Sequence, residues 1–470
     1  MSRRRDPVAD PVRFVDERLG AAPLLRKAFH YVFPDHWSFL LGEIALYSFV
    51  ILVVTGTYIA LFFEPSSHES VYHGSFAPLQ GHVASDAYIS TMRLSFEVPA
   101  GLLMRQTHHW AALVFIAAIV VHVMRVFFTG AFRRPRELNW VIGVTMLALA
   151  VLEGFLGYSL VDDLMSGMGL AIAYAVAISI PGVGGQVATL LWDGRFPGSD
   201  HFWPRLFIGH VFVLPAVLAT LIGLHLAIIM RQHHTQFPGR GRTEGNVVGT
   251  PLWPGYILRT LGWFFAVAAV LVLLGGLVQI NPIWIWGPYE PWQSTNGAQP
   301  DWFLGWLIGA LRTMPPLEAR FAGHTWIPNP FFGGLLFPSV CFGLLYQWPW
   351  LEKRFVTRDR RRHELLDRPR DNPLRTAIGA GFFTWVTVVF IAGAADRILV
   401  TIGFPYEGQI WFFRIADFVA PPVVALLTYA ACRELQRSEL HPLRAFAGRR
   451  VRRTAAGGFV VEPERGVARE

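Results

Sequence analysis

Four histidines are arranged as two pairs within long apolar stretches of the sequence. His108 and His122 are 14 residues apart, and His210 and His225 are 15 residues apart. In a helix, 14 residues end roughly 40° short of four full turns and 15 residues end roughly 60° beyond them, so each pair shares one face. At 1.5 Å per residue, the two rings of a pair are separated by roughly 21 Å along the helix axis. This separation is too large for one metal ion and suits two large cofactors at two depths.

The chemistry that fits this spacing is the binding of haem iron. Neutral imidazole is a common axial ligand of haem, so one histidine from each helix at each depth would hold two bis-histidine haems. Ionisable residues inside an apolar span are costly, which favours a functional interpretation. Buried histidines can also be hydrogen-bonded core residues, but two matched pairs disfavour that alternative. The neighbouring His109 is turned roughly 140° away from the shared face, so we do not expect it to be a ligand.

Composition places the chain in a membrane. It has 470 residues, of which 53% are hydrophobic, and this is typical of an integral membrane protein. The net charge of +8 is almost all arginine, since Lys27 and Lys353 are the two lysines. These arginines flank apolar spans, so they indicate topology and not nucleic-acid binding. Cys341 and Cys432 lie far apart and form no motif for c-type haem or an iron–sulfur cluster, so any such centre would belong to a partner protein.

Eight apolar spans are predicted, each near the length needed to cross a bilayer. Arginine-rich connections follow the second, fourth and sixth spans, and an arginine-rich tail follows the eighth. By the positive-inside rule both termini are cytoplasmic, as an even number of spans also requires. The first 35 residues contain no apolar core, so we expect no cleavable signal peptide. The spans are roughly 38–63, 105–129, 138–160, 205–230, 255–279, 331–350, 375–397 and 411–432.

This topology pairs the histidines by depth. The second and fourth spans both run from outside to inside, so His108 and His210 would ligate an outer haem iron. His122 and His225 would ligate an inner one.

Glycines in the first and third spans repeat the histidine spacing. Gly42 and Gly56 are 14 residues apart, as are Gly143 and Gly157. Glycines often serve helix packing in membranes, but this matched spacing favours sites where a flat macrocycle approaches the backbone.

The histidine-bearing segments resemble those of a known family. The segment His108–His122, with Arg105 three residues before it and Arg125 three after it, resembles the second helix of the cytochrome b subunit of quinol–cytochrome c reductases. The glycine pattern occurs in the same family, and the resemblance covers about residues 30–435. It implies that Arg105 and Arg125 lie near haem propionates, which agrees with the match between a guanidinium fork and a carboxylate.

The resemblance implies an all-α membrane protein with eight transmembrane helices. The first four would form a dihaem four-helix bundle, and surface helices would lie in the outer loops, including residues 166–193. The expected organisation is a cytoplasmic segment 1–36, the dihaem domain 37–254, a C-terminal domain 255–435 with a quinol-site loop, and a loosely ordered cytoplasmic tail 436–470.

A short motif in the loop of residues 280–330 resembles the family's quinol-oxidation motif, Pro-Glu-Trp-Tyr. Here it is Pro300-Asp301-Trp302-Phe303. Asp301 keeps a carboxylate that could accept a quinol proton, although its side chain is one methylene shorter. Phe303 lacks the phenol hydroxyl. Asp301 could also cap the start of a helix. The segment after Gly157 resembles the opening of the same pocket, with Val161-Asp162 where the family has Pro-Trp.

The end of the fourth span carries a second candidate quinone site. Arg231 and the neighbouring His233 lie one to two turns beyond His225. They can be explained by the positive-inside rule alone, or they contact a quinone or pass it protons near the inner haem. This stretch resembles the actinobacterial branch of the family, which implies menaquinol as the electron donor.

The family implies a function in respiration at the bacterial cell membrane. Quinol would be oxidised at the outer face, with one electron passing to a Rieske iron–sulfur protein and a cytochrome c subunit. The other would cross through both haems and reduce quinone inside, generating proton motive force (a Q cycle). The expected partners also include membrane lipid and a second copy of the complex, as a homodimer.

Two alternatives remain from the sequence. One is a dihaem membrane anchor that links another dehydrogenase to the quinone pool, which the altered Pro-Asp-Trp-Phe motif allows. The other is a transporter whose histidines relay protons without haem, which an optical spectrum would distinguish.

Overall fold

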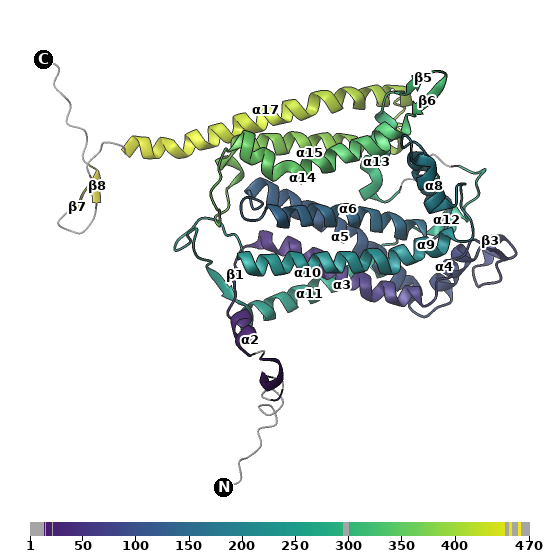
Figure 1. The fold of residues 1–470 in the computed structure, drawn as a ribbon, viewed down its shortest axis with the longest axis horizontal. Helices are drawn as coiled ribbons and strands as arrows, with labels where there is room; N and C mark the ends of the chain where they lie inside the picture. Colours follow the sequence, from purple (N-terminus) through teal and green to yellow (C-terminus); the bar gives the residue numbers. More distant parts are fainter. Residues whose placement is uncertain are drawn as a thin grey trace, which may run out of the picture.

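The computed structural model describes residues 14, 16–20, 22–294, 300–446, 451–453 and 459–461. Seven helices among these residues are long and apolar enough to cross a membrane. They lie side by side with roughly parallel axes (Figure 1). The seven are Trp37–Ala60, Gly101–Thr129, Glu137–Ser159, Phe202–Gln232, Leu252–Leu277, Pro373–Ala394 and Tyr406–Ser438.

Several of these spans contain more than one kind of helix. A 3-10 turn begins the first span, and π-helical segments lie within the fourth and begin the fifth. The elements are η1 (Trp37–Phe39), α3 (Leu40–Ala60), α5 (Gly101–Thr129), α6 (Glu137–Ser159), α9 (Phe202–Ile208), η3 (Gly209–Val213), α10 (Leu214–Gln232), η4 (Leu252–Tyr256), α11 (Ile257–Leu277), α15 (Pro373–Ala394) and α17 (Tyr406–Phe446).

The sixth predicted span, 331–350, is helical but has a different construction. Its α-helix, α14 (Phe337–Leu351), has 15 residues. The π-helical segments η6 (Phe332–Leu336) and η7 (Glu352–Val356) continue it at its two ends. This composite helix is not among the seven described helices that are both long and apolar enough to cross a membrane, so the structure shows seven of the eight predicted spans.

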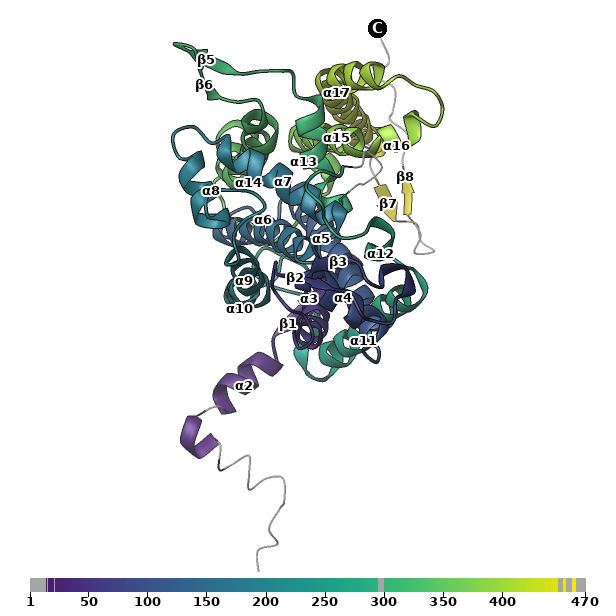
Figure 2. The same cartoon turned by 90° about the vertical axis from the view of Figure 1, so that its right-hand side faces the viewer.

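Short elements gather at one end of the bundle, which we call the outer end (Figures 1 and 2). The predicted surface segment 166–193 forms the two short helices α7 and α8 there. The elements outside the spans on this side are β2 (Glu69–Val71), η2 (Ala77–Leu79), β3 (Val83–Ser85), α4 (Asp86–Phe96), α7 (Leu164–Ile178), α8 (Gly184–Trp192), α12 (Ile283–Trp286), η5 (Trp302–Leu304), α13 (Gly305–Thr313), β5 (Ala319–Phe321), β6 (His324–Ile327) and α16 (Asp396–Leu399). Strands β2 and β3, and β5 and β6, form two antiparallel pairs.

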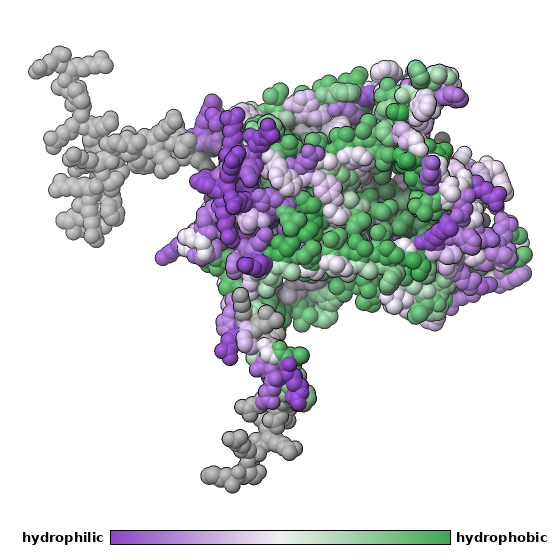
Figure 3. Space-filling view, in the orientation of Figure 1, coloured by the Kyte–Doolittle hydropathy of each residue, from purple (hydrophilic) through white to green (hydrophobic). Residues whose placement is uncertain are grey.

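The opposite end, which we call the inner end, holds α2 (Ala22–Phe29) and the antiparallel pair β1 (Val32–Pro34) and β4 (Gly249–Pro251). It also holds η8 (Pro369–Asp371) and the charged loops between spans. Figure 3 shows an apolar band across this face of the bundle, with hydrophilic residues at both ends. Because such a band would be exposed to water in a soluble protein, it is explained by a surrounding bilayer. The chain is a membrane protein.

Arginines of the inner loops do more than indicate topology. Arg375, whose side chain is fully buried, lies 3.3 Å from a carboxylate oxygen of Glu352 and 2.7 Å from one of Asp367. Arg133 reaches the same Asp367 at 3.1 Å, and Arg136 is paired with Glu364. These contacts tie the connection after α5 to the segment that precedes α15.

Two predicted boundary segments are only partly within the described residues. α17 continues to Phe446, so the boundary predicted at 435 falls inside a helix. Most of the tail 436–470 lies outside the described residues, apart from the end of α17 and the pair β7 (Val451–Arg453) and β8 (Phe459–Val461). Much of segment 1–36 also lies outside them.

The main apolar core joins the histidine-bearing α5 to α6 and to the outer loop. Buried Phe115 and Ile116 of α5 pack with Leu147 of α6 and with Phe303 of the loop. This packing fixes the outer loop motif against the bundle.

Candidate functional site

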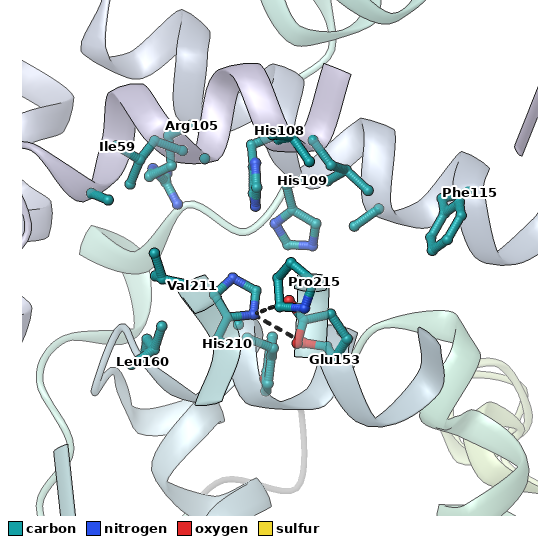
Figure 4. A pocket seen from close by; sticks show the side chains of 18 of the residues that line it. Ile59, Arg105, His108, His109, Phe115, Glu153, Leu160, His210, Val211 and Pro215 are labelled. Atoms are coloured by element: carbon teal, nitrogen blue, oxygen red, sulfur yellow. Dashed lines mark hydrogen bonds and ion pairs between the residues drawn. The ribbon is translucent and has the colours of Figure 1, made fainter. Parts of the chain in front are cut away.

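His108 of α5 and His210 of η3 face each other across a cavity at the outer end. Their ring centroids are 6.2 Å apart, and Figure 4 shows both rings directed toward the same space. Nδ1 of His108 lies 2.9 Å from Oγ1 of Thr55. Nδ1 of His210 lies 3.0 Å from a carboxylate oxygen of Glu153 and 3.2 Å from its backbone oxygen. These bonds occupy Nδ1 of both rings and leave Nε2 as the candidate ligand atom.

The second predicted pair lies deeper toward the inner end. It consists of His122 of α5 and His225 of α10. Nδ1 of each ring is buried and has no hydrogen-bond partner among the residues that the structure describes. Because buried polar atoms are nearly always satisfied, these two atoms indicate a site completed by water or by a bound group.

Each of the four predicted glycines lies against one of the four histidines. A Cβ atom built at Gly157 would be 2.5 Å from Cε1 of His210, and one at Gly56 would be 3.0 Å from Cε1 of His108. At the deeper level, a Cβ atom at Gly42 would be 3.3 Å from Cε1 of His122, and one at Gly143 would be 4.0 Å from Cε1 of His225. The glycines thus leave room beside the rings at both depths.

A π-helical turn explains the unequal spacing of the two histidine pairs. His210 lies in η3, which directly precedes Pro215 in α10. Proline has no backbone N–H to donate within the helix, and a π turn takes in one more residue than an α turn. The 15-residue spacing therefore brings His210 onto the face of His225, as 14 residues do in α5.

The two predicted arginines provide free donors near the two levels. Arg105 is 8% exposed, donates to the backbone oxygen of Asn281 and lines the outer cavity, while its Nε has no partner among the described residues. Arg125 donates to Ser38 and lies 4.3 Å from the centre of the Phe39 ring, and its Nη2 is likewise unpaired. The facing histidines fit a group that contains a metal, and the space beside the glycines fits a flat ring. The unpaired guanidinium donors fit anionic side chains on that ring.

The sequence suggested that Asp301 could cap the start of a helix, but in the structure it does not. It precedes η5, but its side chain makes no capping hydrogen bond. Both of its carboxylate oxygens instead lie 2.8 Å from Nε2 of His109. The contact also explains where His109 points, because the imidazole turns away from His108 and toward the outer loop.

Two of the four residues Pro300–Phe303 line the outer cavity. The cavity has a volume of about 230 Å³, and Asp301 and Phe303 line it together with the outer histidines. Phe303 is 3% exposed and packs against Gly154, whereas Trp302 is 38% exposed. Pro300 begins the described part of the loop after residues 295–299, which lie outside it.

Asp162 and Asp163 follow Val161, which lines this cavity. Asp163 caps α7 through a capping box with Ser166. Asp162 accepts a 2.5 Å hydrogen bond from the hydroxyl of Ser85. Burial, together with the nearby carboxylates of Asp163 and Glu290, raises the pKa of Asp162 to about 7.

At the inner end, His234 makes the contact of interest, and it lies next to the predicted His233. Arg231 and His233 are exposed. His234 is partly buried, and its Nδ1 lies 3.1 Å from the hydroxyl of Tyr31. Burial, together with the nearby positive charges of Arg136 and Arg125, lowers the pKa of His234 to about 3, so its ring is neutral.

Sequence reasoning missed three of these residues. Glu153 could have been found, because an acidic residue in an apolar span is itself a functional signal. His234 is adjacent to His233, and spacing alone could not show which of the two faces the protein interior. Tyr31 lies far away in the sequence and carries no motif.

Three comparisons with known proteins show the family to which the chain is related. The family model described as "Cytochrome b(N-terminal)/b6/petB" matches residues 113–288. The chain is 49% identical over 426 residues to the "Cytochrome bc1 complex cytochrome b subunit" of Mycobacterium tuberculosis, covering 90% of this chain and 77% of that protein. It is 45% identical over 439 residues to the protein of the same name from Streptomyces coelicolor, covering 93% and 80%.

A solved structure named "Hyperthermophilic respiratory Complex III" shares the fold, with a TM-score of 0.64 and 20% sequence identity. It matches 89% of this chain and all of its own chain. With relatives this similar over nearly its whole length, the chain belongs to the cytochrome b subunits of cytochrome bc1 complexes, which are respiratory oxidoreductases that bind haem and quinone.

Proposed function

We propose that this chain is the dihaem cytochrome b subunit of a menaquinol–cytochrome c reductase. It oxidises quinol at the outer end, passes electrons across the membrane and reduces quinone at the inner end in a Q cycle. The observation that carries the proposal is the match of four histidines with four glycines, at two depths, in four neighbouring spans.

His108 and His210 would hold the outer haem iron, and His122 and His225 the inner one. Gly56 and Gly157 give clearance at the outer level, and Gly42 and Gly143 at the inner level. The unpaired donors of Arg105 and Arg125 would each bind propionates. When bound, the two haems supply one-electron oxidation and reduction at two depths.

Asp301 is the proposed proton acceptor for quinol in the outer cavity. Its carboxylate lines the cavity and is held by His109. A positioned carboxylate acts as a general base when it lies within hydrogen-bond reach of the proton. Buried Phe303 closes the wall behind it and excludes water from that side.

At the inner end, we propose a quinone site around the end of α10. His234 and the Tyr31 hydroxyl form its hydrogen-bonding part. Arg231 and His233 remain candidates for proton delivery, because they are exposed and close in sequence.

The proposed topology has eight spans with both termini in the cytoplasm. The composite helix from Phe332 to Val356 is the sixth span, since its length of roughly 35 Å exceeds the bilayer core of about 30 Å. α2 and the end of α17 then lie on the cytoplasmic side. A Rieske iron–sulfur protein and a cytochrome c subunit complete the enzyme, and the complex is a homodimer.

The test is to purify the complex from its native membrane and measure haem and activity together. We expect two b-type haems per chain in a reduced-minus-oxidised spectrum, co-purified iron–sulfur and cytochrome c subunits, and menaquinol–cytochrome c reductase activity. His108→Ala and His210→Ala should remove one and the same haem, and His122→Ala and His225→Ala the other. His68→Ala, at a side chain that is 75% exposed, is the control. Loss of different haems from His108→Ala and His210→Ala would refute the pairing.

A further inference from the structure

Glu153 is an acidic side chain inside the apolar span α6, four residues before Gly157. Residues four apart lie one turn apart on the same helix face. α6 therefore presents two features to His210: a glycine that lets the ring approach and, one turn earlier, a carboxylate. Figure 4 shows Glu153 and His210 directed toward each other.

Glu153 lies close to His210, but only one of its two carboxylate oxygens has a partner. Oε1 of Glu153 lies 3.0 Å from Nδ1 of His210 in an ion-pair contact, and the same nitrogen is hydrogen-bonded to the backbone oxygen of Glu153 at 3.2 Å. Oε2 is buried and has no hydrogen-bond partner among the described residues. The side chain of Glu153 is 16% exposed, so water screens its charge little.

The four proposed iron ligands differ in this respect. Nδ1 of His108 meets the neutral hydroxyl of Thr55. Nδ1 of His122 and of His225 meets no partner in the described part of the chain. Of the four, His210 alone is paired with a carboxylate.

We propose that Glu153 is a positioning residue for His210, which it orients through Nδ1, and that its charge lowers the reduction potential of the outer haem relative to the inner one. The proposal rests on the ligand set proposed above. It involves no bond making and no further reactant.

The physical basis is the hydrogen bond to the second nitrogen of an iron-bound imidazole. A carboxylate that accepts this N–H fixes the ring's tautomer and orientation and makes the ring a stronger electron donor. Electron donation and nearby negative charge both favour the oxidised, more positive metal. The inner level is roughly 21 Å away along α5, so the effect falls mainly on the outer site. Electron transfer from the outer to the inner level is then favoured.

The test is a redox titration of haem absorbance in the purified holo-complex carrying Glu153→Gln. Glutamine keeps the size and an acceptor oxygen but removes the charge. We expect full haem content, a shift of the outer step to higher potential and an unchanged inner step. Glu153→Asp, which keeps the charge, should shift the outer step less than Glu153→Gln does.

The matched control is Glu43→Gln. Glu43 is also an acidic residue inside a span, but hydroxyl groups of Tyr47, Tyr256 and Thr260 bind its carboxylate. It should leave the outer step unchanged. Selective loss of the outer haem in Glu153→Gln, with retention in Glu153→Asp, would also support the positioning role.

An unchanged outer potential in Glu153→Gln, or an equal shift of both steps, would overturn the inference. His210→Ala separates this failure from a failure of the proposed function. If His210→Ala removes the outer haem while Glu153→Gln has no effect, the ligand set holds and the role of Glu153 is wrong. If His210→Ala leaves both haems in place, the ligand set itself is wrong.

Discussion

Nε2 of His109 lies 2.8 Å from both carboxylate oxygens of Asp301, although 192 residues separate the two in the sequence. Two adjacent histidines on α5 thereby take different roles. His108 faces His210 across the cavity, and His109 holds the outer loop motif against the same cavity. This contact brings the proposed quinol site next to the proposed outer haem site.

Replacing Asp301 by asparagine should remove the proton acceptor while leaving the size of the side chain and the fold. We expect quinol oxidation to fall by roughly 10²- to 10⁴-fold, the usual contribution of a general base, with full haem content. Steady-state menaquinol–cytochrome c reductase assays on the purified complex measure this. Asp301→Glu restores the residue of the related motif and should stay active. Glu318→Gln, at a carboxylate of the outer loop that is paired with Arg320, should have no effect. Full activity in Asp301→Asn would contradict the role.

Alanine at the four glycines should damage the haem sites in order of clearance. Gly157→Ala places a Cβ atom 2.5 Å from His210 and should displace the ring, whereas Gly143→Ala, at 4.0 Å from His225, should be tolerated. Overpacking of this kind costs about 1–3 kcal/mol. Haem content and the two redox steps report the result: Gly157→Ala should lose most of the outer haem and keep the inner one. Gly223→Ala in α10, where a Cβ atom meets nothing within 4 Å, is the control. Equal haem loss in all of these variants would argue against a site-specific role.

Breaking the buried ion pair at the inner end should destabilise the whole chain. Arg375→Met leaves Glu352, which is 2% exposed, without its cation. Removing one partner of a buried pair costs about 3–5 kcal/mol, because the other charge stays buried and unpaired. Thermal unfolding of the detergent-solubilised protein should show a clearly lower midpoint. Arg437→Met removes an exposed partner of Glu434 and should leave the midpoint unchanged. An unaltered midpoint in Arg375→Met would show that the network carries little stability.

The raised pKa of Asp162 predicts a pH dependence of stability. Because burial raises this pKa from 3.8 to about 7, the folded state binds the proton more tightly than the unfolded chain. The contribution is fully present below about pH 4 and is lost as the pH rises through about 7. It amounts to at most a few kcal/mol, since each pKa unit is worth about 1.4 kcal/mol.

Asp162→Asn should remove this dependence. Unfolding midpoints measured at about pH 5 and about pH 8 should differ less in the variant than in the parent protein. The variant should be more stable than the parent at the higher pH. Asp200→Asn, on an exposed outer loop, serves for comparison. The same pH slope in the parent and in Asp162→Asn would be the contrary result.

The sequence by itself determined the class of protein, its long spans and the residues of the two histidine levels. It could do so because helix periodicity and bilayer thickness are local constraints, which act on residues within one span. The positions of His108 and His122 on one helix face follow from such spacing, and the predicted order and direction of the spans then pair His108 with His210.

The tertiary structure decided what depends on contacts between distant segments. Spacing alone could not show that a π turn before Pro215 absorbs the extra residue, nor that 331–350 forms a helix with π segments at both ends. The partners of Asp301 and His210 come from other elements, α5 and α6. Hydrogen bonds and burial arise only when the spans pack, so no local pattern could have assigned these partners.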